Sequence, residues 1–187
     1  MILPAPQFPP VSGESDGQRI ARIVRSFNGC SLSSRRADLA ALVGRGVDDE
    51  SIVTIQTNCA TFALGVLAAA GCAHPILKRT YVNGMAFSWL VQIGNDLGAW
   101  RDPATDGPPV TGAAMWYEVA GMNDDHVEWC VDASVPIHGG GGRPNNAITV
   151  GPGPIALSCG RPLHRWLDPE RLGLPGWIDG TDEEPHS

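Results

Sequence analysis

Hydrophobic positions follow a helical period in the first half of the chain. Between residues 17 and 27, Ile20, Ile23, Val24 and Phe27 have the i, i+3, i+4, i+7 spacing of one helix face. Similar but shorter patterns, ended by glycines or an Asn-Gly pair, follow further along. Helices are therefore predicted over residues 17–27, 35–43, 59–70 and 85–97.

Small polar residues that favour helix starts precede three of these segments. Ser15 or Asp16 is the expected N-cap of the first helix, Ser34 that of the second, and Asn58 or Thr57 that of the third. Each offers a side-chain oxygen to the free N–H groups of a first turn.

The helix predicted over residues 59–70 is apolar on nearly all sides. Alanine and leucine dominate it, and Gly71 is a suitable residue to follow its last turn. A helix without a polar face has to be buried, so we expect this one at the centre of the fold.

The hydrophobic period changes to two in the second half of the chain. Within residues 126–132, His126, Glu128 and Cys130 alternate with three apolar residues, which predicts a strand with these three side chains on one face. Residues 161–178 are expected to fold over the resulting sheet. Further strands are predicted over residues 112–119, 135–138, 146–150 and 155–158. Helices first and strands afterwards indicate an α+β fold.

The length of 187 residues predicts one domain. Residues 1–14 contain four prolines and are expected to form an extended or disordered arm. The domain itself should cover residues 15–178, and residues 179–187 should form a frayed acidic tail. The 23 glycines and 16 prolines predict many turns and ordered loops.

Charge and hydropathy exclude several classes of protein. The chain has 13 Lys and Arg against 20 Asp and Glu, a net charge of −7, which argues against binding to nucleic acid through phosphate contacts. Its longest apolar stretch, residues 63–73, is far shorter than the roughly 20 residues of a membrane span. The first residues lack the basic start of a signal peptide. We expect a soluble protein.

Five scattered cysteines point to chemistry rather than to a scaffold. No Cys-x-x-Cys pair occurs, which argues against a structural zinc site, and the odd number argues against a pure disulfide framework. Whether Cys30 and Cys72 pair stays open. At least one free thiol is allowed, although a buried and inert cysteine is the ordinary case.

Cys59 is the candidate nucleophile. It stands at the start of the predicted buried helix, where free N–H groups and the helix dipole favour a thiolate and an oxyanion. A cysteine nucleophile needs a nearby base, and His126 opens a predicted strand after a turn. His138 lies twelve residues further, at the end of the next strand, so an antiparallel pair would bring the two imidazoles side by side.

Four segments of this chain resemble the NlpC/P60 cysteine peptidases. Thr57–Phe62 (TNCATF) resembles the start of their nucleophile helix, and Gly112–Tyr117 (GAAMWY) resembles one of their strands. Asp125–Val127 and Ile137–Gly139 resemble the segments that carry their two histidines. The resemblance implies a papain-like fold and hydrolysis of peptidoglycan stem peptides without a cofactor. It also implies Cys59 as nucleophile, His126 as general base and His138 as the residue that orients it.

The chain departs from the family at three positions. Asn58 replaces an Asp and Ala60 replaces a Ser, both of which help to bind the free amine of the substrate in the family. Glu128 replaces a Gly and should point the same way as His126. Either it is buried and needs a partner, or the strand is an edge and the carboxylate is solvated.

Other candidates carry weaker signals. Gln56 or the amide of Cys59 are candidates for the oxyanion site. Arg143, after four glycines, is either a surface residue or a contact for a substrate carboxylate. Asn145 or Asn146 rivals His138 as the orienting residue, because papain itself uses an asparagine. No metal ligand set is predicted.

The leading hypothesis is therefore a cell-wall hydrolase. Delivery by a specialised route as an antibacterial effector with an immunity protein, or by a phage as a lysin, fits a chain without a signal peptide. Alternatives are a CHAP-type amidase, an acyltransferase, a protein-targeting deamidase or protease, or a non-catalytic binding or virion structural domain. Proximity of the Cys59 sulfur to a nitrogen of His126 separates the enzymes from the binding domain.

Overall fold

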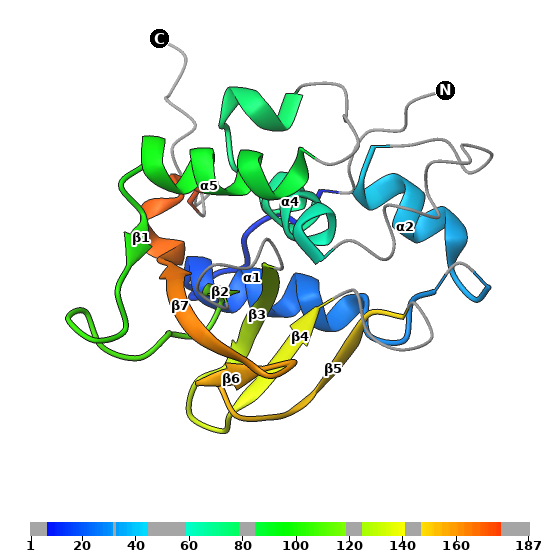
Figure 1. Ribbon diagram of the computed structural model, residues 1–187. Helices are drawn as coiled ribbons and strands as arrows, with labels where there is room; N and C mark the ends of the chain where they lie inside the picture. The colour runs from blue at the N-terminus through cyan, green and yellow to red at the C-terminus, as the bar shows by residue number, and fades with distance from the viewer. Residues whose placement is uncertain are drawn as a thin grey trace, which may run out of the picture.

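Helices cover one side of an antiparallel sheet in the computed structural model (Figure 1). The structure describes residues 7–31, 33–44, 59–78, 85–118, 125–140 and 147–176. Within them the helices are α1 (Asp16–Ser26), α2 (Arg36–Leu42), α4 (Cys59–Ala69) and α5 (Ala86–Asp96), with short 3-10 turns at Pro75–Lys78 and Pro169–Arg171. The helices precede most of the sheet, so the predicted α+β class is confirmed.

Seven strands form the sheet, and β3 is one of its inner strands. The order is β1-β7-β2-β3-β4-β5, with β6 paired to β7. Their bounds are β1 Trp100–Arg101, β2 Ala114–Tyr117, β3 His126–Asp132, β4 Ile137–Gly140, β5 Thr149–Pro152, β6 Leu157–Ser158 and β7 Arg161–Leu167.

The last strand is where the sequence prediction is wrong. Residues 161–167 do not fold over the sheet: they form β7, which pairs with β1 on one side and β2 on the other. The two-residue strand β1 was not predicted either. Both errors have one cause, because β1 and β7 hold each other through pairing between distant segments, which a local hydrophobic period does not reveal.

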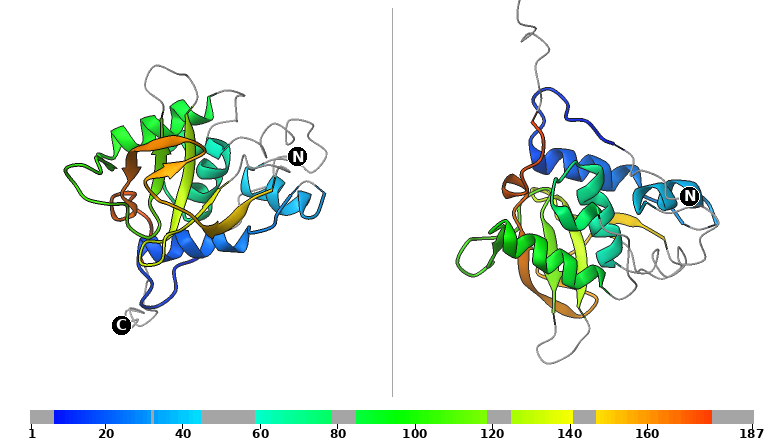
Figure 2. Two further views of the ribbon diagram at one scale, coloured as in Figure 1. Left: turned by 60° about the horizontal axis from the view of Figure 1, so that its bottom comes forward. Right: turned by 90° about the horizontal axis from the view of Figure 1, so that it is seen from above.

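Helix α4 occupies the middle of the helical layer, as predicted. Nine of its residues, Ala60 to Leu67 and Ala69, are buried. Figure 2 (right) shows it between α1 and α5, over the sheet. Gly71 follows the helix with φ +87°, the left-handed conformation expected of a residue after the last turn.

The helix starts agree with the sequence in one case and differ in another. Ser15 accepts the N–H of Gln18, whose side chain accepts the N–H of Ser15, which makes a reciprocal cap on α1. Ser34 does not cap α2. The N-cap is Arg35. The Ser34 hydroxyl instead donates a hydrogen bond to the carbonyl oxygen of Gly29 at 3.2 Å.

The two faces of the sheet bury different side chains. On the face that we call the helix side, Val127, Trp129 and Val131 pack into the main core with α1 and α4. On the opposite face, the far side, Cys130 packs with four other buried residues. These are Ala113, Met115, Tyr117 and Trp166.

Strand β4 extends further than the sequence suggests. Gly139 and Gly140 belong to it rather than to a loop, and His138 lies opposite Cys130 of β3. Glycine is needed here, because a Cβ at Gly139 would lie 2.8 Å from Val150 Cγ2.

The two ends of the described chain meet at one side chain. The Arg19 guanidinium donates to the carbonyl oxygens of Phe8 at 2.7 Å and Pro175 at 3.0 Å. The Phe8 amide also donates to Ala69 of α4, which holds the segment before α1 against the core. Among the described residues, no helix is long and apolar enough to cross a membrane.

Candidate active site

Cys59 begins helix α4 and is partly exposed. Its Sγ accepts the backbone N–H of Val127 at 3.3 Å, which ties the helix start to the beginning of β3. A sulfur at the first residue of a helix also lies near the positive end of the helix dipole. The position therefore combines access for a ligand with a backbone N–H donor beside the sulfur.

His126 begins β3 and is buried beside this sulfur. Its imidazole lies close enough to Cys59 for the thiol to affect the pKa of the ring. Its Nε2 lies 3.0 Å from Oε1 of Glu128, which leaves Nδ1 as the ring nitrogen for the sulfur. The structure thus places Cys59 and His126 at the same end of β3.

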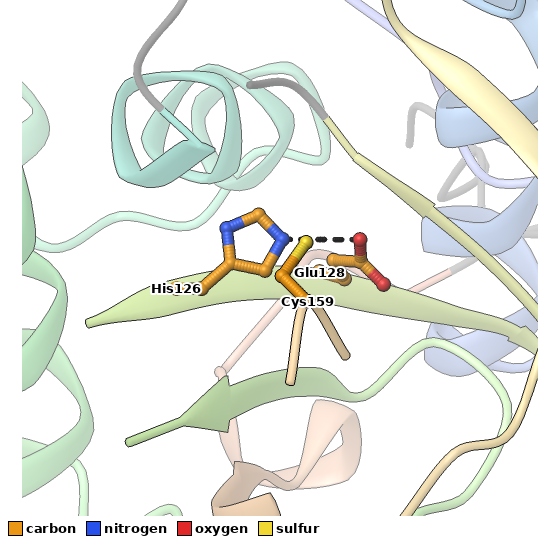
Figure 3. Close-up of side chains that lie close together, drawn as sticks. All are labelled: His126, Glu128 and Cys159. Atoms are coloured by element: carbon orange, nitrogen blue, oxygen red, sulfur yellow. Dashed lines mark hydrogen bonds and ion pairs between the residues drawn. The ribbon is translucent and has the colours of Figure 1, made fainter. Parts of the chain in front are cut away.

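Glu128 is the carboxylate between two histidines. It is fully buried, with Oε1 toward His126 and Oε2 toward Nδ1 of His138. Figure 3 shows His126 and Glu128 rising from the same strand and facing each other. Of the two alternatives for Glu128, the structure contains the buried and partnered one, because β3 is an inner strand between β2 and β4.

His138 does not stand where the sequence placed it. The register pairs it with Cys130, four residues along β3 from His126, so the two imidazoles are not side by side and Glu128 fills the space between them. Gly153 leaves room for the ring, since a Cβ there would overlap Nε2 of His138. The position next to His126 thus belongs to Glu128, and His138 contacts the second oxygen of that carboxylate.

The environment of His126 favours its charged form. Burial alone would lower its pKa, but the hydrogen bonds and charges of Cys59 and Glu128 outweigh burial and raise the pKa to about 10. The imidazolium is therefore the dominant form at neutral pH, with an acceptor on each side of the ring.

Three other cysteines are buried, unlike the partly exposed Cys59. Cys30, Cys72 and Cys130 are buried, and burial raises the pKa of each thiol, that of Cys130 to about 11. All five cysteines are free, so Cys30 and Cys72 do not form a disulfide. Cys130 is packed in the far-side cluster, as the sequence suggests.

Cys159 is the neighbour that sequence reasoning missed. This exposed residue follows β6, and its sulfur belongs to a group with His126 and Glu128 whose ligand atoms all lie within 4.8 Å of one another (Figure 3). Among the described residues, these three could hold a metal ion. No local pattern connects Cys159 with His126, because the hairpin of β6 and β7 brings it there.

The remaining candidates stay predictions. They lie outside the described residues and are Gln56, Asn58, Arg143, Asn145 and Asn146. The oxyanion and substrate-binding groups of the site therefore rest on sequence alone, apart from the start of α4.

No protein-family model, curated protein or solved structure matches this chain. The similarity to NlpC/P60 peptidases thus stays a resemblance of short segments.

Proposed function

We propose that the protein is a cysteine-dependent amide hydrolase with Cys59 as nucleophile and His126 as acid and base. One observation carries the proposal: a partly exposed cysteine at a helix start contacts the start of β3 beside a buried histidine, one ring nitrogen of which is held by a buried carboxylate. Nucleophile, base and orienting group in this order are the arrangement that thiol hydrolases need.

In the first half of the reaction, the Cys59 thiolate attacks the amide carbonyl carbon and the carbonyl oxygen becomes an oxyanion. The N–H groups at the start of α4 are the available donors for that oxyanion. His126 then gives its proton to the amine nitrogen as the C–N bond breaks, which leaves a thioester on Cys59 and a neutral imidazole.

In the second half, His126 removes a proton from water as the water oxygen attacks the thioester. The C–S bond breaks, the acid product leaves, and the thiolate and imidazolium return. The same nitrogen serves as acid and then as base, which requires a ring of fixed orientation.

Glu128 supplies that orientation and is the third member of the proposed triad. Its Oε1 fixes the Nε2 side of the ring and stabilises the imidazolium. His138 is a positioning residue that acts through Oε2 of Glu128. We further propose that the fold is papain-like, with the third residue on the strand of the base rather than on the next strand.

Peptidoglycan stem peptides are the proposed substrate class. This part rests on the sequence resemblance, and so does the proposal of a cell-wall lytic role as an effector with an immunity partner or as a phage lysin. The hydrolase chemistry is the part that the geometry of Cys59, His126 and Glu128 supports.

The test is digestion of purified peptidoglycan, with the fragments identified by mass. Wild-type protein should release new peptide fragments, and Cys59→Ala should release none. Cys130→Ala is the matched control, because it removes a thiol from the strand of His126 without touching the proposed nucleophile. Fragment release by Cys59→Ala, or none by the wild type on peptidoglycan and simple peptide amides alike, would contradict the proposal; binding without cleavage would favour the non-catalytic domain.

A further inference from the structure

The turn after β6 places a third donor beside the proposed base. Cys159 has φ +51°, and its sulfur lies 3.8 Å from the hydroxyl of the buried Ser158. Arg161 donates to the Cys159 carbonyl oxygen at 3.1 Å. The turn is thus held in place by its own contacts while the sulfur stays exposed.

We propose that Cys159, Glu128 and His126 form a binding site for a zinc ion that inhibits the enzyme. One ligand atom of each residue lies within 4.8 Å of the other two, and the three residues come from two separate parts of the chain. Figure 3 shows the Cys159 sulfur next to the line between His126 Nε2 and Glu128 Oε1. Inhibition by zinc rests on the proposed function, whereas zinc binding itself does not.

The spacing suits zinc with little movement. Zinc bonds of about 2.0–2.3 Å in a tetrahedral arrangement separate the ligand atoms by about 3.4–3.8 Å. His126 Nε2 and Glu128 Oε1, now 3.0 Å apart, need to open by less than about 1 Å. Three protein ligands leave the fourth position for water, and the exposed sulfur gives the ion a way in.

The donor types select the metal. A thiolate and an imidazole favour zinc over magnesium or calcium, which prefer sites of oxygen alone. The thiolate and the carboxylate together carry two negative charges, which a divalent ion neutralises. Sequence spacing does not predict this site, because the three residues lack any metal-binding pattern.

Zinc binding and catalysis would compete for one imidazole. A zinc ion on Nε2 of His126 takes the place of the hydrogen bond to Glu128 and keeps the ring from carrying two protons. The one remaining proton, on Nδ1, is held far more tightly than that of an imidazolium, because its transfer to a leaving amine would leave a zinc-bound imidazolate. Zinc should therefore inhibit reversibly, and a chelator should restore activity.

The experiment measures metal binding apart from activity, on the full chain. Competition with a coloured chelator should give one zinc per wild-type chain, and Co²⁺ in its place should show the near-ultraviolet absorption of a metal thiolate. Cys159→Ser should weaken zinc at least tenfold and abolish that absorption. Cys59→Ala should keep the zinc affinity and the Co²⁺ absorption of the wild type. His164→Ala, which removes the exposed histidine that pairs with Glu118, should keep them too.

Activity gives the second readout. Zinc should inhibit the wild type and leave Cys159→Ser, with its basal activity, far less affected. Zinc binding of unchanged strength in Cys159→Ser, or binding lost in His164→Ala, would overturn the proposed site. Normal zinc binding by a wild type that cleaves nothing would support the site and contradict the proposed function.

Discussion

Both faces of strand β3 are hidden from solvent, yet at one end of the strand they bury different kinds of side chain. The helix side holds Val127, Trp129 and Val131 in the main core. The alternate positions His126 and Glu128 hold ionisable groups, which are buried against one another and His138. Apolar burial stabilises a fold by itself, whereas buried charge needs partners and often adds little net stability. The buried ionisable pair is therefore better explained by the proposed acid–base role than by stability.

The strongest test of this contrast is Glu128→Gln. The amide keeps the size of the side chain but cannot stabilise an imidazolium, so we expect kcat/KM to fall by about 10³-fold with the fold intact. The matched control is Glu118→Gln, in the exposed pair with His164, which should stay within about twofold of the wild type. Steady-state kinetics on a peptide amide give both values, and equal losses would erase the distinction between the two carboxylates.

On the helix side of β3, removal of a buried apolar side chain should lower the stability of the fold. Trp129→Ala should lower the free energy of unfolding by about 3–5 kcal/mol, because the indole is almost fully buried in the main core. Val135→Ala, in the exposed turn after β3, should change it by less than about 0.5 kcal/mol. Urea unfolding followed by circular dichroism measures both, and a stable Trp129→Ala variant would contradict the assignment of the core.

The free energy of unfolding should depend on pH through the proton that His126 shares with Glu128. His126 has an unfolded pKa near 6.5 and a folded pKa of about 10, so the folded state binds its proton more tightly. The stability from this proton is complete below pH 6.5 and is lost as the pH rises toward 10. In Glu128→Gln the slope across that window should flatten. An NMR titration of His126 should move to lower pH in the same variant, and an unchanged titration would count against the carboxylate as its partner.

The smallest expected effect concerns the position of His138. Gly153→Ala places a Cβ where the ring now lies, so His138 must move away from Glu128. We expect kcat/KM to fall by about tenfold with little change in KM. Gly151→Ala, whose Cβ meets nothing within 4 Å, is the control and should behave as the wild type. Equal kinetics for the two variants would show that His138 does not position Glu128.

Local patterns predicted the parts of the fold that depend on nearby residues. The period of α1, the apolar composition of α4 and the alternation in β3 each lie within one segment, and Cys59 and His126 could be chosen from them. Strand β7 could not be placed, because its neighbours in the sheet are β1 and β2.

The candidate site was also predicted only in part. Glu128 was placed on the side of His126, but its burial depends on β4 covering an inner strand, which the alternation of β3 does not contain. The departure from glycine at that position was the signal, and the resemblance directed attention to His138 instead. Cys159 gave no signal, because a distant hairpin carries it to the site.

The placement of His126 and Glu128 two residues apart on one strand has a mechanical consequence. The pleat of a single strand sets their relative position, so the acid–base pair moves as one rigid part of the sheet. The sulfur belongs to a different layer, at the tip of α4, and joins the sheet through the Val127 amide. A slight slide of the helices over the sheet would move the Cys59 sulfur away and leave His126 and Glu128 assembled, so the contact between the two layers is where the proposed activity would be switched on or off.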